Sequence, residues 1–153
     1  MCAMVSSWVL AVIHLLGVGL AFAAIYSRAR FLGKPVKQLD LPEAFLADSL
    51  WGISALVLVL TGLTRAFGGF EKGTLYYGHQ PFFHIKMACL VLIFLLEIFP
   101  MITLLRWRIG RAKGDVTLNL AVAAKLSQIS YVQLFLLVPM VLCAAAMARG
   151  IMI

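Results

Sequence analysis

Apolar residues form four long runs along the chain, separated by shorter polar segments. The runs cover about Val5–Ile25, Leu50–Phe67, Phe82–Leu105 and Val122–Met147. A helix that crosses a bilayer needs about 20 apolar residues, or about 30 Å at 1.5 Å per residue. Each run meets this length. With their flanking turns included, we predict four transmembrane helices, at about 5–29, 48–67, 82–106 and 122–148.

The pattern predicts an all-α fold, an integral membrane four-helix bundle that forms one domain over residues 1–153. Composition agrees, since 63% of residues are apolar and 12% are charged, against about 45–50% and about 25% in soluble domains. Such a chain has too little polar surface for a soluble globule. The connections between the runs are short, which excludes a separate soluble catalytic domain. The three cysteines have no disulfide or metal-site spacing.

The net charge of +7 does not form one basic patch, so we exclude nucleic acid as a partner. Nine basic residues map to one side of a four-helix chain, and these are Arg28, Arg30, Lys34, Lys37, Arg106, Arg108, Arg111, Lys113 and Lys125. The positive-inside rule makes that side cytoplasmic. We therefore expect a multi-pass protein of the bacterial cytoplasmic (inner) membrane, with both termini on the outer, periplasmic side. Its expected partners are the lipid bilayer and other membrane subunits.

Small and polar residues mark the helix faces that should pack together, because lipid-solvated helices associate through such residues. In the first predicted helix, His14, Ala21 and Arg28 are spaced by sevens. The second carries a stripe of Asp48, Gly52, Ala55, Val59, Gly62 and Ala66. We interpret Asp48 as the N-cap or first-turn acid of that helix, and the neighbouring Trp51 as part of an interfacial aromatic belt. The connection 31–47 is amphipathic and is expected along the inner interface.

Glu97 lies deep in the third predicted helix, past the membrane midplane. Lys86 is on nearly the same face, eleven residues earlier. A lone carboxylate at this depth is costly, so Glu97 is expected to be protonated, paired or beside water. Gln133 of the fourth helix reaches a similar depth and is a candidate hydrogen-bond partner. The role of Glu97 is either structural or in handling a proton or an ion.

A second group of basic residues maps to the outer side, where the positive-inside rule disfavours it. This group comprises Arg65, Lys72, Lys86 and Arg149. With His14 below and Tyr77 above, it resembles a pocket for an anionic amphiphile, such as a porphyrin with two carboxylates or a lipid phosphate. The alternative is that these are rim residues whose long side chains reach the interface.

His14 has three candidate roles. Imidazole is a common ligand of haem iron, so His14 is the candidate metal ligand of the chain. A buried histidine can equally donate a hydrogen bond to the next helix, or transfer protons. His79 and His84 are expected at the interface rather than as ligands.

Several blocks spread over nearly the whole chain are distinctive, and these are Gly62–Phe67, Glu71–Gly73, Tyr76–Tyr77, Pro81–Phe83 with Lys86, Pro100 with Leu105–Arg108, and Met147–Gly150. Together they resemble an uncharacterised family of small bacterial membrane proteins with a four-helix domain of unknown function. More distantly, the chain is similar to the bacterial membrane-bound protoporphyrinogen oxidase family. That resemblance makes His14 and Lys86 counterparts of a histidine and a lysine of that family, with Arg65 as a third, and it implies haem b.

These observations predict a haem b- or porphyrin-binding, redox-type membrane protein with a pocket on the outer side. Its binding residues would be His14, Arg65, Lys72, Tyr77, Lys86 and Arg149. The alternatives are an accessory or scaffold subunit of a larger membrane complex, and a protein that handles lipids or anions. The chain carries no flavin or nicotinamide motif and no catalytic motif, so the sequence leaves open whether the protein is an enzyme.

Overall fold

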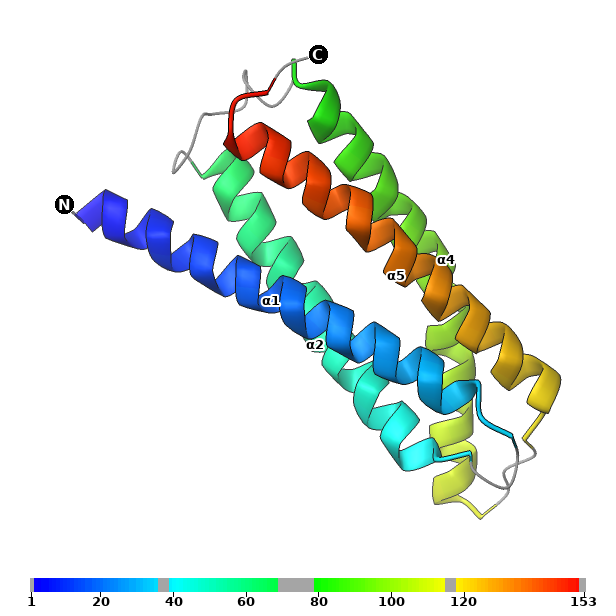
Figure 1. Cartoon of the computed structure of the whole chain (residues 1–153). Coiled ribbons are helices and arrows are strands. Elements are labelled where there is room, and N and C mark those ends of the chain that lie inside the picture. Colours follow the sequence, from blue (N-terminus) through cyan, green and yellow to red (C-terminus); the bar gives the residue numbers. More distant parts are fainter. Residues whose placement is uncertain (1, 36–38, 69–78, 115–117, 152–153) are drawn as a thin grey trace.

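Four helices make up the part of the chain that the structure, a computed structural model, describes, which is residues 2–35, 39–68, 79–114 and 118–151. They are α1 (Cys2–Leu32), α2 (Leu41–Phe67), α4 (Pro81–Ala112) and α5 (Leu120–Ala148) (Figure 1). Each is long and apolar enough to cross a membrane. At about 1.5 Å per residue they measure roughly 40–48 Å, more than the ~30 Å hydrocarbon core. The predicted all-α, four-helix membrane fold is confirmed.

Local sequence signals explain where three of the helices begin. Asp40 caps α2, and its carboxylate accepts a hydrogen bond from the backbone N–H of Glu43 at 3.4 Å. Asn119 caps α5 in the same way and accepts from the N–H groups of two residues in its first turn. Pro81 opens α4, at a position where the missing proline N–H costs nothing.

The start of α2 differs from the sequence prediction. Helix begins at Leu41 rather than at 48, so residues 41–47 are not part of an interfacial connection. Asp48 consequently lies two turns inside the helix and is not its cap. Trp51 is 4% exposed in the core, so its assignment to an aromatic belt was wrong. The helix starts earlier than predicted because Asp40 caps it, and its first two turns bury Ala44 and Ala47 in the core.

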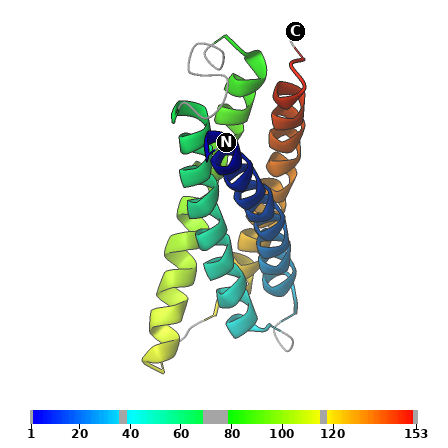
Figure 2. The ribbon, with the colours of Figure 1, turned by 90° about the vertical axis from the view of Figure 1, so that its left-hand side faces the viewer.

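The helices pack in the order α2, α1, α5, α4. Helix α1 packs along both α2 and α5, and α4 packs along α5, whereas the backbones of α2 and α4 approach each other at few positions. Figure 2, which views the bundle from the side of the N-terminus, shows α2 and α4 as neighbours in its lower left part. The start of α1 and the end of α5 lie at one end of the bundle, here called the terminal end (Figure 1). The opposite end, where Leu32 and Ala112 end their helices, is called the basic end.

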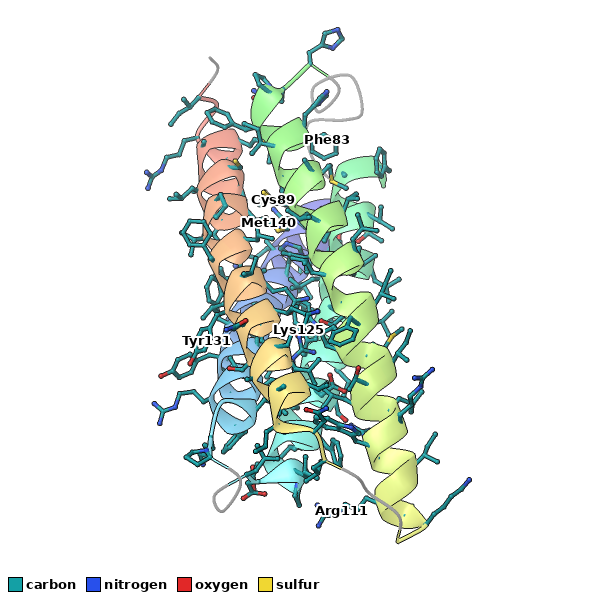
Figure 3. The ribbon with its side chains drawn as sticks, turned by 90° about the vertical axis from the view of Figure 1, so that its right-hand side faces the viewer. Phe83, Cys89, Arg111, Lys125, Tyr131 and Met140 are labelled. Carbon is teal, nitrogen blue, oxygen red and sulfur yellow. The ribbon has the colours of Figure 1, made fainter. Side chains whose placement is uncertain are left out.

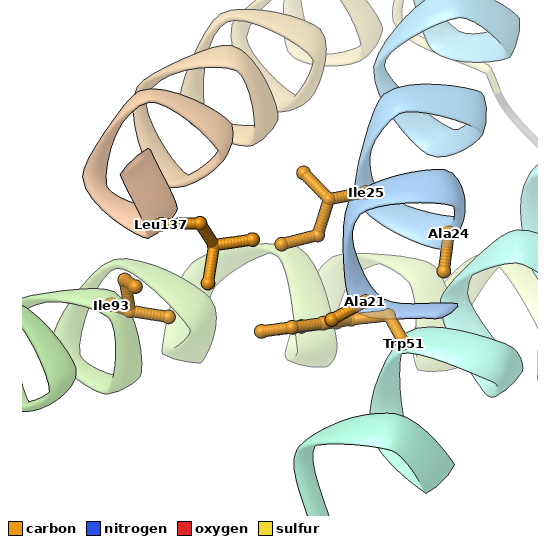
Figure 4. Close-up of a cluster of buried hydrophobic side chains, with 6 residues drawn as sticks. All are labelled: Ala21, Ala24, Ile25, Trp51, Ile93 and Leu137. Atoms are coloured by element: carbon orange, nitrogen blue, oxygen red, sulfur yellow. The ribbon is translucent and has the colours of Figure 1, made fainter. Parts of the chain in front are cut away.

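Two apolar layers, each built from all four helices, form the core. The first is the cluster of Ala21, Ala24, Ile25, Trp51, Ile93 and Leu137 (Figure 4). The second lies nearer the basic end and contains Leu32, Ala44, Leu104 and Leu126. Arg28 and Asp48 fall between these layers along α1 and α2, as Glu97 and Gln133 do along α4 and α5. The core is therefore a polar layer enclosed by two apolar layers.

The outer faces of the helices carry large apolar side chains, as expected for contact with lipid. Tyr131 of α5 projects away from the bundle in Figure 3 and is 44% exposed. Lys125, also on α5, is exposed but lies over the ring of Phe99 of α4, with its ammonium nitrogen 5.3 Å from the ring centroid. This basic residue thus belongs to a helix face, not to a loop.

Gly33 permits the close packing of the end of α1 on α5. A Cβ atom at this position would stand 2.9 Å from the hydroxyl oxygen of Ser127, which is held by its hydrogen bond to the Ala29 carbonyl at 2.7 Å. We predict that Gly33→Ala lowers the free energy of unfolding by about 1–3 kcal/mol through overpacking. Denaturation of the purified protein in detergent measures this change.

Gly19→Ala is the matched control, because a Cβ on Gly19 would meet nothing within 4 Å. Alanine in place of an open glycine inside a helix is expected to be stabilising by about 0.5–1 kcal/mol. Equal stability of the two variants would contradict this account of the α1–α5 contact.

Candidate functional site

Arg28 is the centre of the polar layer, and its side chain is completely buried. A guanidinium group has five N–H donors. Nε donates to the Ser130 hydroxyl at 3.0 Å, Nη1 to Asp48 at 2.9 Å and Glu97 at 2.7 Å, and Nη2 to Glu97 and Gln133 at 2.8 Å each. The five donors are matched by five hydrogen bonds, with partners from α2, α4 and α5. An external anion would therefore have to displace one of these partners to bind Arg28.

The partners of Arg28 also bond to one another or to backbone. Glu97 binds the guanidinium with both carboxylate oxygens, and its Oε2 also accepts from the Gln133 amide at 2.8 Å. The same amide nitrogen donates to the Ile93 carbonyl at 3.2 Å. Ser130 accepts from Arg28 and donates its own proton to the Leu126 carbonyl at 2.9 Å. The side chains of Arg28, Glu97, Gln133 and Ser130 therefore form one continuous hydrogen-bonded network.

Asp48 connects the network to the basic end. Its Oδ1 accepts from Arg28, while its Oδ2 lies 3.7 Å from Nη2 of Arg108 on α4. Arg108 also donates to the Phe45 carbonyl at 3.0 Å and to the Ser49 hydroxyl at 3.2 Å. Exposure rises along this path, from 0% for Arg28 to 19% for Asp48 and 44% for Arg108. The polar layer is therefore buried at Arg28 and open to the basic end at Arg108.

The net charge of the polar layer is zero only when its two arginines and two carboxylates are counted together. Arg28 is shared by two carboxylates, and Arg108 supplies the second positive charge at longer range. Isolated charges at membrane depth are very costly, whereas paired and hydrogen-bonded ones are tolerated. The network therefore stabilises the bundle only while its members stay together, and removing one member leaves the others unpaired.

His14 does not belong to this network and contacts α2 instead. Its Nδ1 lies 2.7 Å from the hydroxyl oxygen of Thr61, and that hydroxyl donates its proton to the Val57 carbonyl at 2.6 Å. With its own proton directed at Val57, the Thr61 hydroxyl is an acceptor for Nδ1 of His14, which corresponds to the tautomer protonated at Nδ1. Of the roles considered for His14, the hydrogen bond to the next helix is the one present here. The ring packs beside Gly62, where a Cβ would meet its Cε1 at 3.5 Å.

The other predicted binding residues lie at the terminal end on three helices. Arg65 in the last turn of α2 and Lys86 in the second turn of α4 are half-buried, and Arg149 at the end of α5 is exposed. Arg65 follows Thr61 by four residues and so shares the helix that His14 contacts, whereas Lys86 and Arg149 stand on the other helix pair. The predicted contributions of Lys72 and Tyr77 lie outside the described residues.

The remaining histidines lie at the surface of the terminal end. His79 and His84 are both exposed, and the His84 ring makes an edge contact with the Phe83 ring at 6.2 Å. Among the described residues, no group of three or more His, Cys, Asp or Glu side chains is placed to hold a metal ion.

Sequence patterns paired Glu97 with Gln133 but missed the centre of the polar layer. The pairing of Glu97 with Gln133 is confirmed, and Glu97 is paired rather than lone. We expected Arg28 among the charges that orient the chain, although its spacing by sevens from His14 and Ala21 placed it on the packed face. Since α1 continues to Leu32, Arg28 lies inside the helix, and that periodicity was the signal that identifies it.

The chain is thus an integral membrane protein of four helices built around an intramembrane charge network. It belongs to the family described as predicted membrane protein, DUF2214, which matches residues 6–152. No curated protein and no solved structure matches the chain.

We predict that Glu97→Ala lowers the free energy of unfolding by about 3–5 kcal/mol, because it leaves Arg28 buried with half of its carboxylate partners removed. Reversible unfolding in mixed detergent micelles measures the change. Glu43→Ala is the control, since Glu43 is an exposed acid in the first turn of α2 and its loss is expected to cost no more than about 0.5 kcal/mol. A Glu97→Ala protein as stable as this control would show that the network contributes little.

Proposed function

We propose that the protein binds haem b or a related porphyrin at its terminal end and serves as a redox-type component of the bacterial cytoplasmic membrane. In this proposal the basic end faces the cytoplasm, in accord with the positive-inside rule. The observation that carries the proposal is the hydrogen bond between His14 and Thr61. Metal-ligating histidines typically donate their second ring N–H to an oxygen of the surrounding protein, which orients the ring and fixes the tautomer.

The tautomer of His14 fits that arrangement. Thr61 accepts the Nδ1 proton, so Nε2 is the ring nitrogen with ligand character. Haem carries two carboxylates, and Arg65 and Lys86 are cationic residues of the same end that suit such groups. Bound haem would supply one-electron redox chemistry. The chain itself would ligate the iron, neutralise the carboxylates and exclude water.

A visible absorption spectrum tests this function directly. Protein purified in mild detergent and supplied with haem b is expected to develop a Soret band with saturable, stoichiometric binding. His14→Ala is expected to lose the band, because the iron loses its protein ligand. His84→Ala is the matched control, since this histidine is exposed at the same end, and it should bind like the unaltered chain. Absence of a Soret band in the unaltered protein, or equal binding by His14→Ala, would refute the proposal.

A second candidate, an accessory subunit of a larger membrane complex, is favoured by how little of each helix is covered. In the most apolar window of each span, only 17–28% of the residues are buried within the chain. Such faces contact either lipid or the helices of a partner. Cross-linking in native membranes followed by purification is expected to recover a defined complex under this candidate. A monodisperse monomer that binds haem would favour the first function instead.

A further inference from the structure

The contact between α2 and α4 is the weakest junction between neighbouring helices of the bundle. Their backbones approach at few positions, unlike those of the three other neighbouring pairs. Arg108 bridges them near the basic end, through its hydrogen bonds to Phe45 and Ser49 and its ion pair with Asp48. Its guanidinium also lies over the Phe45 ring, 5.1 Å from the centroid. We call this set of contacts the α2–α4 clasp.

Asp48 is the residue that joins the clasp to the buried network, because it pairs with both Arg28 and Arg108. The charged groups that act on its carboxylate are Arg28 from α1 and Glu97 and Arg108 from α4. Helix α5 presents the neutral Ser130 and Gln133 to the same network. One of the three neighbouring charges is thus a second carboxylate, which competes with Asp48 for Arg28.

The two carboxylates are not held equally. Glu97 accepts three hydrogen bonds, two from Arg28 and one from Gln133. Asp48 accepts one from Arg28 and has an ion pair at 3.7 Å with a half-exposed arginine. Asp48 is therefore the carboxylate of the pair with fewer hydrogen-bond donors. The 19% exposure of Asp48 also lets a proton arrive from water at the basic end.

We propose that Asp48 is a proton-binding site whose occupancy opens the α2–α4 clasp. A proton from water at the basic end adds to Oδ2 and converts the carboxylate to a neutral acid. The charge of the group formed by Arg28, Arg108, Asp48 and Glu97 then rises from zero to +1. Arg108 loses its ionic partner on α2, and the two like-charged guanidinium groups are no longer separated by an anion.

The contacts that Arg28 keeps confine the structural change to the contact between α2 and α4. Arg28 keeps its bidentate contact with Glu97 and its hydrogen bonds to Ser130 and Gln133. Helices α1, α4 and α5 therefore stay together, while the α2–α4 clasp loses its ion pair and is left with the hydrogen bonds of Arg108 to Phe45 and Ser49 and its contact with the Phe45 ring. Opening at this position extends the access from the basic end beyond Arg108 toward Arg28, so the site couples proton uptake to access from one side of the membrane.

Distances between spin labels on α2 and α4 test the proposal. The labels are placed at Leu46→Cys and Ile109→Cys, two exposed positions beside the clasp, after replacement of the native cysteines by alanine. The full chain is reconstituted in nanodiscs of zwitterionic lipid and measured by pulsed EPR at about pH 7.5 and about pH 3, above and below the ordinary aspartate pKa of about 3.9. We expect a longer, broader distance distribution at the lower pH. A label pair at Leu20→Cys and Ile53→Cys, on α1 and α2, is expected to be unchanged.

Substitutions assign the response to Asp48. Asp48→Asn, which is neutral at every pH, is expected to give the open distribution at both pH values. Asp40→Asn is the matched control on the same helix, because asparagine also caps helices, and it should respond like the unaltered chain. Arg108→Gln should be open at both pH values, which provides a second variant if Asp48→Asn does not fold. An unaltered chain with one pH-independent distribution, or variants that still close at about pH 7.5 and open at about pH 3, would overturn the proposal.

Discussion

The burial of the Arg28 guanidinium is the constraint on which the rest of the bundle depends. A permanent charge in a medium without water must be compensated by groups from its own protein. Here the compensation is complete, with five donors meeting acceptors from α2, α4 and α5. Apolar contacts between lipid-solvated helices tolerate sliding, because lipid replaces one apolar neighbour by another. The charge network does not tolerate such sliding, so it fixes the register of the four helices.

The fold was predictable because the bilayer imposes a length on every spanning segment. The starts of α4 and α5 and the end of α2 fell close to the predicted positions, where apolar runs meet polar residues. The start of α2 was missed because the cap is Asp40 and not Asp48, and Asp40 lies within a segment of mixed polarity. Hydropathy alone reports where a helix enters hydrocarbon, whereas capping decides where the helix begins.

The candidate site was only partly predictable, since depth and periodicity give the face of a residue but not its partner. Glu97 and Gln133 were matched by depth, and the contact exists. Arg28 lies near the end of an apolar run, where cationic residues usually reach the interface, and this general tendency obscured its role. The His14–Thr61 contact needed the crossing of α1 on α2, which no linear pattern contains.

The distribution of the network along the chain bears on how the protein enters the membrane. Arg28 and Asp48 belong to the first two helices in sequence and neutralise each other as a hairpin. Glu97 arrives later, on a helix whose other polar partners are elsewhere, and a charged residue at the centre of an isolated helix opposes insertion by about 2.5–3.5 kcal/mol. The hairpin of α1 and α2 thus already contains Arg28, the guanidinium that pairs with Glu97 of α4. The order of the helices along the chain thus places the cationic partner of Glu97 in the sequence before Glu97 itself.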